Sequence, residues 1–238
     1  MDLPTRMKRY ESASSTVVTP RTPVVVRVDG RSFSRYTAPL RKSGFASLEF
    51  RTVMAEVGLA MANQCSDVEC AFIQSDEISL LFHFYKDFES LPWFGGKIQK
   101  IASVTAGIAS SEFTARSPQM FSGEMRPAHF DSRVFVLPEA EVENYFISRF
   151  RDCTRNSVQM MAQFNFSHKE LQGKSITEQQ EMLRNAGRPW EALDAYQKYG
   201  TMIVKDADTR EWVSHAAGPI MNDPPTRNAL FQRLLATT

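Results

Sequence analysis

Two short acidic motifs contain residue types that could bind metal ions. The first is Asp29-Gly30, which follows a run of valines, and the second is Asp76-Glu77, which separates two apolar segments. Either motif alone is also typical of a turn, because Asp and Gly are common turn residues. Carboxylates from two motifs that meet at one point repel each other, and a bound cation relieves that repulsion. The position of the motifs in the fold therefore decides between a turn and a metal site.

The apolar spacing predicts six elements around these motifs. Their order is a strand at 23–28, a helix at 46–64, strands at 69–74 and 78–84, a helix starting at 98 and a strand at 128–136. The two middle strands are predicted to form a β-hairpin with Asp76 and Glu77 at its tip. This α+β order, βαββαβ, is the split-βαβ or ferredoxin-like arrangement. Its first strand lies beside the hairpin, so we expect Asp29 and Asp76 to meet at one end of the sheet.

Hard oxygen ligands of this kind suit Mg²⁺, which completes its coordination with water and substrate phosphates. Two such ions about 3.5–4 Å apart can activate an attacking hydroxyl and stabilise a leaving oxygen in phosphoryl transfer. An exposed acidic turn explains the segment Ser75-Asp76-Glu77 taken alone. The expected pairing with Asp29 favours the metal site.

Composition limits the classes of protein that fit. The 238 residues allow one large domain or a domain with a substantial extension, and the net charge of +1 indicates no basic tail for nucleic acid. No apolar run is long enough to span a membrane, and the N-terminal residues do not resemble a signal peptide. Cys65, Cys70 and Cys153 show no zinc-site spacing, so we expect buried thiols in a reducing cytoplasm.

Residues 139–238 are predicted to form a mainly helical extension that packs on a catalytic domain at 1–138. We expect a broken helix over 139–164, a helix capped by Ser167, a helix that begins near Thr177 and ends at Gly187, and a small hairpin at 200–205 and 210–214. The tail from residue 222 is left without an assigned structure.

Four segments resemble the tRNA-histidine guanylyltransferase family, whose members are 3′–5′ polymerases. They are VRVDGRSFSRY, QSDEISLLF, DSRVFVLP and RNSVQMMAQFNFSHKELQGKS, and the resemblance extends from about Arg27 to Lys205. The first three motifs in this order are specific, although each alone is a weak signal. The family has a palm domain like that of conventional polymerases and nucleotidyl cyclases, so the resemblance implies a polymerase palm at 1–138.

The resemblance also implies roles for individual residues. Asp29 and Asp76 would carry two Mg²⁺ ions with help from the Gly30 carbonyl, and Glu77 would be a further acidic residue required for catalysis. Ser75 matches the family position that contacts the triphosphate. Further candidates for binding ATP, GTP or another NTP are Arg27, Arg31, Ser32, Phe33, Lys42 and Asn156.

Basic residues outside these motifs suggest additional contacts. Lys97 and Lys100 start the second predicted helix, where the positive helix end favours phosphate, although their spacing alone favours a solvated helix face. Candidates for contact with the tRNA acceptor arm are Arg155, His168, Lys169 and Lys174. Lysines that serve only solubility are the alternative explanation for this group.

Family members add nucleotides to the 5′ end of a tRNA. This chain departs from the eukaryotic members at residues 154–160, where TRNSVQM replaces a His-Ile-Asn-Asn-Leu-Tyr-Asn run and keeps only Asn156. It also has Gly95-Gly96-Lys97 where they have paired arginines. Both departures resemble the bacterial, archaeal or viral branch, which repairs truncated tRNA 5′ ends against a template.

We therefore expect template-dependent repair of tRNA, with Mg²⁺ and nucleoside triphosphates, by a cytoplasmic enzyme without a membrane partner. The resemblance implies a homotetramer. Addition of G to tRNA-histidine is the alternative within the family. A palm-type nucleotidyl cyclase and a non-catalytic RNA-binding module are the alternatives from other classes, and the presence of three acidic residues, Asp29, Asp76 and Glu77, counts against the last.

Overall fold

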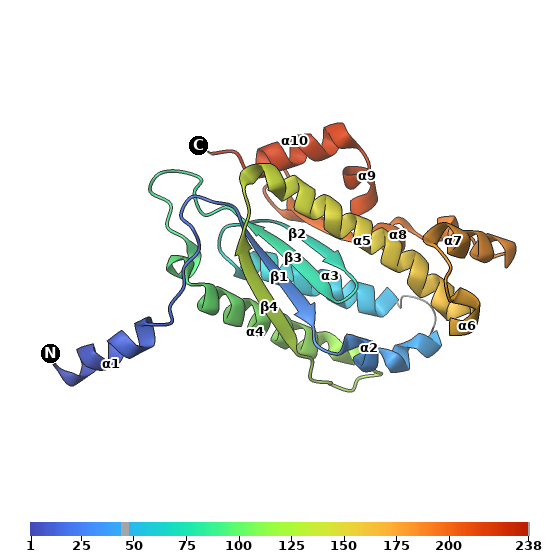
Figure 1. The fold of residues 1–238 in the computed structure, drawn as a ribbon, viewed down its shortest axis with the longest axis horizontal. Helices are drawn as coiled ribbons and strands as arrows, with labels where there is room; N and C mark the ends of the chain where they lie inside the picture. Colours follow the sequence, from blue (N-terminus) through green and yellow to red (C-terminus); the bar gives the residue numbers. More distant parts are fainter. Residues whose placement is uncertain (44–47, 238) are drawn as a thin grey trace.

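The computed structural model describes residues 1–43 and 48–237 (Figure 1). Within these residues the chain forms a six-stranded antiparallel sheet with the order β4-β1-β3-β2-β5-β6. The strands are β1 (Val24–Gly30), β2 (Val68–Gln74), β3 (Glu77–Phe82), β4 (Phe130–Val136), β5 (Thr201–Lys205) and β6 (Trp212–Ala216). The first four strands have the order 4-1-3-2 of a ferredoxin-like sheet, so the predicted α+β palm arrangement is confirmed.

Helices cover both faces of the sheet (Figure 1). The α-helices are α1 (Leu3–Ser12), α2 (Phe33–Tyr36), α3 (Leu48–Gln64), α4 (Ile98–Arg116), α5 (Glu139–Asn165), α6 (His168–Leu171), α7 (Ile176–Asn185), α8 (Ala195–Tyr199), α9 (Ala217–Met221) and α10 (Pro224–Leu234). One face packs against α3 and α4, and the other packs against α5, α9 and α10. The helix α1 projects from the body and buries no side chain. None of the helices described is long and apolar enough to cross a membrane.

The strand β1 supplies both cores, because successive side chains of a strand point to opposite faces. Val24, Val26 and Val28 pack in the core with α3 and α4, whereas Val25 packs in the core with α5 and α10. The same alternation places Asp29, four residues after Val25, on the α5 face. This face is where the candidate site forms.

The helix α5 runs without interruption for 27 residues, so the predicted break is wrong. Its first half packs under the sheet through Phe146 and Phe150, and its second half packs against α7 through Val158 and Met161. Because the two halves serve different hydrophobic clusters, a change in the apolar pattern along α5 does not mark a break.

Other C-terminal predictions are confirmed with changed limits. Ser167 caps α6 in a capping box with Glu170. The helix expected from Thr177 begins at Ile176 after its cap Ser175, and Gly187 follows its end with a φ of 69°. The predicted hairpin is β5–β6, and β5 pairs with β2, so the C-terminal part of the chain adds two strands to the palm sheet. The unassigned tail contains all of α10, and α9 ends directly before it at Met221.

Candidate active site

The sheet brings the two acidic motifs together at one end. Asp29 is the register partner of Glu77 where β1 pairs with β3. The main-chain N–H of Gly30 donates a hydrogen bond of 3.1 Å to the carbonyl oxygen of Asp76. The end of β1 and the tip of the β2–β3 hairpin therefore form one structural unit.

Local backbone geometry explains the residues beside the aspartates. A Cβ atom at Gly30 would clash with the ring of Phe33, so glycine permits the close approach of α2 to the strand end. Ser75 has a φ of 49° at the hairpin tip, and this left-handed conformation turns the chain directly before Asp76. Ser32 is also left-handed, with a φ of 58°, where the chain enters α2.

The two aspartates sit in an environment that disfavours two free negative charges. Burial raises the pKa of Asp29, and repulsion from Glu77 and Asp131 adds to the rise. Burial also raises the pKa of Asp76 to about 6, and the carboxylates of Asp29 and Glu77 contribute in the same direction. Asp131 belongs to this group because it is the register partner of Asp29 on β4. A proton or a cation would stabilise this end of the sheet.

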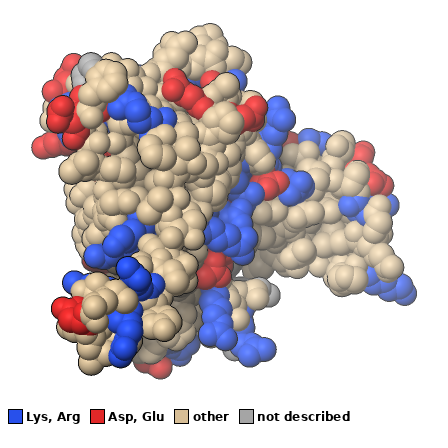
Figure 2. All heavy atoms as spheres, turned by 60° about the vertical axis from the view of Figure 1, so that its left-hand side comes forward, with Lys and Arg blue, Asp and Glu red and all other residues tan. Residues whose placement is uncertain are grey.

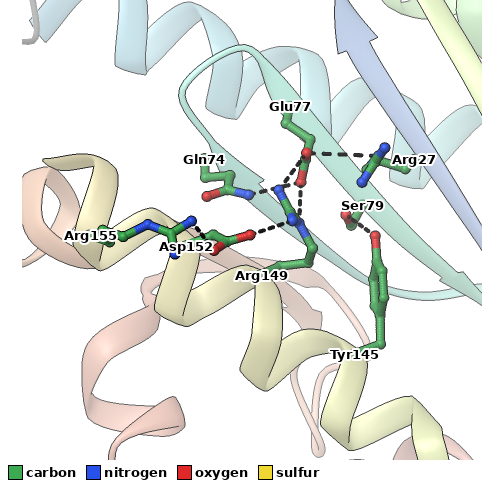
Figure 3. A network of polar contacts seen from close by, with 8 residues as sticks. All are labelled: Arg27, Gln74, Glu77, Ser79, Tyr145, Arg149, Asp152 and Arg155. Atoms are coloured by element: carbon green, nitrogen blue, oxygen red, sulfur yellow. Dashed lines mark hydrogen bonds and ion pairs between the residues drawn. The ribbon is translucent and has the colours of Figure 1, made fainter. Parts of the chain in front are cut away.

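The side chain of Glu77 forms its hydrogen bonds with Arg149 of α5 and with Gln74, and not with the two aspartates (Figure 3). Its Oε1 accepts hydrogen bonds from Arg149 Nε at 2.8 Å and from Gln74 Nε2 at 2.9 Å. Its Oε2 accepts a bond of 2.7 Å from a terminal nitrogen of Arg149 and lies 3.8 Å from Arg27 Nε. Arg149 also donates to Asp152 at 2.7 Å. Both oxygens of Glu77 are thus occupied by protein donors.

A cavity of about 380 Å³ opens beside the two aspartates. Its polar wall includes Ser75 of the hairpin tip and Asn156 of α5, and its apolar wall includes Met54 of α3 and Met160 of α5. An acidic end that attracts a cation, beside an apolar wall, suits a cation-bound phosphate group attached to a flat ring system.

The predicted nucleotide-binding residues do not all lie at this cavity. Ser75 and Asn156 line it. Arg27 does not line it, but its Nε lies 3.8 Å from Oε2 of Glu77, which does. Arg31 is exposed just after β1. Phe33 is only 4% exposed and packs against the rings of Tyr36, Phe50, Phe113 and Phe130, so it is a core residue in this structure. The side chain of Lys42 lies outside the described residues.

Lys97 and Lys100 are at the other end of the sheet. Lys97 forms an isolated β-bridge with Val17, in the segment that leads into β1. The helix α4 and the strand β1 therefore begin at the same end of the sheet. The later part of α4 reaches the aspartate end, where Ser110 accepts a hydrogen bond from the Phe130 amide. The two lysines line a separate pocket of about 360 Å³ and do not lie with the aspartates.

The tRNA-binding candidates lie on α5, on α6 and in the turn that follows α6. Arg155 forms an ion pair with Asp152, and Lys174 lies 3.4 Å from Glu178. His168 and Lys169 are exposed on α6. On the face drawn in Figure 2, Lys and Arg side chains form small groups with Asp and Glu among them. That face offers no single broad basic surface, in keeping with the net charge of +1.

The fit of a metal ion depends on the donors at the aspartate end. Asp29, Asp76 and the Gly30 carbonyl are oxygen donors, the type that Mg²⁺ prefers. Over residues 1–43 and 48–237, no three Asp, Glu, His or Cys side chains form a group that could hold a metal. These donors fit an ion that takes its remaining ligands from water and substrate phosphates, as Mg²⁺ commonly does.

Several cavity residues were not predicted from the sequence. Arg149 and Gln163 lie on the same face of α5 as Asn156, at helical spacings of seven residues. Arg51 of α3 lines the cavity and forms two hydrogen bonds, of 3.1 and 3.2 Å, with Asp194 at the start of α8. The polar stripe on α5 is a sequence signal that could have identified Arg149 and Gln163.

Known proteins similar to this chain identify its family. A model of the tRNAHis guanylyltransferase family matches residues 4–138. A bacterial tRNA(His) guanylyltransferase-like protein in complex with ATP has a TM-score of 0.89 and 32% identity, with all of both chains covered. A similar bacterial protein in complex with GTP has a TM-score of 0.81 and 32% identity, with 98% of this chain and 99% of that chain covered.

Sequence relatives agree with this assignment. An uncharacterized protein of Acanthamoeba polyphaga mimivirus is 27% identical over 224 residues, 84% of this chain and 76% of the viral protein. The tRNA(His) guanylyltransferase 1 of Arabidopsis thaliana is 28% identical over 190 residues, 74% of this chain but only 30% of the plant enzyme. With its palm sheet and its matching motifs, the chain belongs to the tRNAHis guanylyltransferase family, whose members are nucleotidyltransferases.

Proposed function

We propose that this protein adds nucleotides to the 5′ end of truncated tRNA, in the 3′–5′ direction and under the control of a template base. The observation that carries the proposal is the meeting of Asp29 and Asp76 at the mouth of a cavity lined by Ser75 and Asn156. The bacterial structures in complex with ATP and GTP support a nucleoside triphosphate as the ligand of that cavity.

The chemistry consists of two displacements at phosphorus. First, a 5′-phosphate oxygen of the tRNA attacks the α-phosphorus of ATP, which forms an adenylylated 5′ end and releases pyrophosphate. The 3′-hydroxyl of an incoming NTP then attacks the 5′ phosphorus of the tRNA, which forms a phosphodiester, releases AMP and gives up the hydroxyl proton. A tRNA that already has a 5′-triphosphate releases pyrophosphate instead. One site can serve each step, because each needs the same alignment and the same neutralisation of phosphate charge.

The residues of the chain divide this work. Asp29, Asp76 and the Gly30 carbonyl would hold two Mg²⁺ ions, which supply positive charge at the reacting phosphate. Ser75 and Asn156, which line the cavity, would donate hydrogen bonds to phosphate oxygens. Met54 and Met160 provide apolar surface for a base.

Repair is preferred over addition of G to tRNA-histidine because of the run TRNSVQM. These residues lie on α5, and Asn156 is the one that both matches the family run and lines the cavity. An enzyme that reads an anticodon needs side chains placed for unpaired bases, whereas a repair enzyme takes its information from base pairing. The chain lacks the run found in the tRNA-histidine-specific enzymes, which favours repair.

The basic test is incubation with a labelled NTP, Mg²⁺ and a tRNA that lacks its first nucleotide. The proposal expects a tRNA that is longer at its 5′ end. A cyclic nucleotide formed without RNA would instead indicate a nucleotidyl cyclase. Retention of RNA without any nucleotide product would indicate a binding module. Four copies per particle are part of the proposal by family resemblance, and light scattering tests that number.

A further inference from the structure

Arg149 connects α5 to the hairpin tip that carries Asp76 (Figure 3). We propose that Arg149 is a positioning residue: it holds Glu77 in place, and Glu77 in turn keeps the Ser75–Asp76 turn beside Asp29. Glu77 thus serves as the anchor of the tip rather than as a metal ligand. The inference rests on the proposed nucleotide addition, for which Asp29 and Asp76 must stay together.

The contact between Arg149 and Glu77 has the geometry of a strong pair. Two nitrogens of the guanidinium each donate to a different carboxylate oxygen, at 2.8 and 2.7 Å. The two side chains are only 17% and 11% exposed. A planar fork that meets a carboxylate in this way fixes both distance and orientation, which a lysine cannot do.

The remaining nitrogen of Arg149 is also engaged, because Nη1 donates to Asp152 at 2.7 Å. Arg149 lines the cavity, yet all three of its side-chain nitrogens contact carboxylates of the protein. These contacts assign it to holding the site together rather than to binding substrate phosphate.

The position of Glu77 determines where Asp76 lies. Glu77 is the first residue of β3 and follows Asp76 directly. Ser75, on the other side of Asp76, has the left-handed φ of 49° that sets the turn. A shift of the Glu77 side chain is therefore transmitted over one peptide unit to Asp76. A second tie between α5 and β3, the hydrogen bond of 2.8 Å between Tyr145 and Ser79, lies further from the tip and would remain intact.

The test compares Arg149→Met and Arg149→Lys with the matched control Arg227→Met. Arg227 also pairs with a glutamate of α5, Glu143, at 2.7 Å, and the two side chains are 15% and 27% exposed. The control therefore removes a comparable ion pair from the same helix without touching the hairpin tip. Thermal unfolding midpoints are measured for all variants, and kcat and KM are measured well below these midpoints.

We expect Arg149→Met to lower kcat about 100-fold, the loss typical of a catalytic group displaced by roughly 1 Å. The KM for tRNA should stay within about threefold, because no substrate contact is removed. Arg149→Lys should give an intermediate kcat. Arg227→Met should lose as much thermal stability but keep kcat within about threefold of the wild type. The double variant E77Q/R149M should be no slower than the slower single variant, because the two residues act as one unit.

Three results would overturn the positioning role. The first is a kcat of Arg149→Met close to that of Arg227→Met. The second is a raised KM for the NTP with an unchanged kcat, which would make Arg149 a substrate-binding residue. The third is additive effects of E77Q and R149M on the unfolding midpoint, a readout that needs no activity. Absence of nucleotide addition by the wild type would overturn the proposed function, and the inference with it. Any of the three results above, with an active wild type, would overturn the inference alone.

Discussion

The main-chain N–H of Gly30 donates its hydrogen bond to the carbonyl oxygen of Asp76, and this bond joins the two acidic motifs. In the sequence the motifs are separated by α2, α3 and β2, yet in the sheet they lie on neighbouring strands. Both aspartates are attached to strand ends rather than to a long loop. A site built on strand ends holds its geometry better than a site on loops, which suits chemistry at phosphorus.

Removal of either aspartate should abolish nucleotide addition. Asp29→Asn and Asp76→Asn keep the side-chain size but remove the negative charge that a divalent cation requires. We expect product formation below about one percent of wild type, a loss comparable to that from removal of one group that stabilises transition-state charge. Labelled NTP incorporation measures it. Asp87→Asn, in the exposed loop after β3, is the control, and near-wild-type activity of either site variant would rule out the two-aspartate site.

The stability of the metal-free protein should depend on pH through Asp76. Burial raises the pKa of this carboxyl from 3.8 to about 6, so the folded state keeps a proton that the unfolded chain has already released. The carboxyl therefore lowers stability as the pH rises through this window. Asp76→Asn should be no more stable than wild type near pH 4 and more stable above about pH 6, by at most about 3 kcal/mol.

Urea unfolding of both proteins in a chelator, at a series of pH values, measures this difference. A stability gain from Asp76→Asn that shrinks as the pH rises would contradict the burial of this carboxyl.

Gly200 should matter more for stability than Gly187. Gly200 joins α8 to β5 with a φ of 73° and a ψ of −168°, and a Cβ there would clash with the carbonyl oxygen of Ile73. Gly200→Ala should cost about 2 kcal/mol or more, because strain and steric overlap add. Gly187 also has a positive φ, of 69°, but nothing lies within 4 Å of the added atom. Gly187→Ala should cost only about 1 kcal/mol. Equal losses in chemical denaturation would contradict this distinction.

Phe33 should affect stability rather than nucleotide binding. Its ring is packed among other aromatic rings and does not line the cavity. Phe33→Ala should lower the unfolding free energy by about 3–5 kcal/mol. Phe33→Leu should fold, with a reduced melting temperature and an unchanged KM for the NTP. An increased KM without a loss of stability would restore Phe33 to the nucleotide site.

The sequence was sufficient to predict that the two acidic motifs lie together at one end of the sheet. Alternation in the strands and helical spacing between them defined the βαββαβ order, and that order places the end of β1 beside the hairpin tip. The orientation of Glu77 could not be predicted in this way. It depends on α5 lying across the same face of the sheet, and periodicity along α5 does not say which element its polar stripe meets.

Two other features were missed for similar physical reasons. Phe33 follows a motif rich in polar residues, and its burial results from tertiary packing with Phe113 and Phe130, which are distant in sequence. The pairing of β5 with β2 was not predicted, because a hairpin does not indicate which sheet edge it will extend. The tail did carry a helix signal, since Asp223-Pro224 is a typical cap followed by a first-turn proline.

The most direct test of the central claim changes the template base. The substrate is a tRNA that lacks its first nucleotide, prepared in four versions that differ only in the base opposite the missing position. The account predicts that the protein adds the complementary nucleotide to each version, and that a changed anticodon has little effect. Addition of G alone, and only to tRNA-histidine whatever base lies opposite, would contradict it.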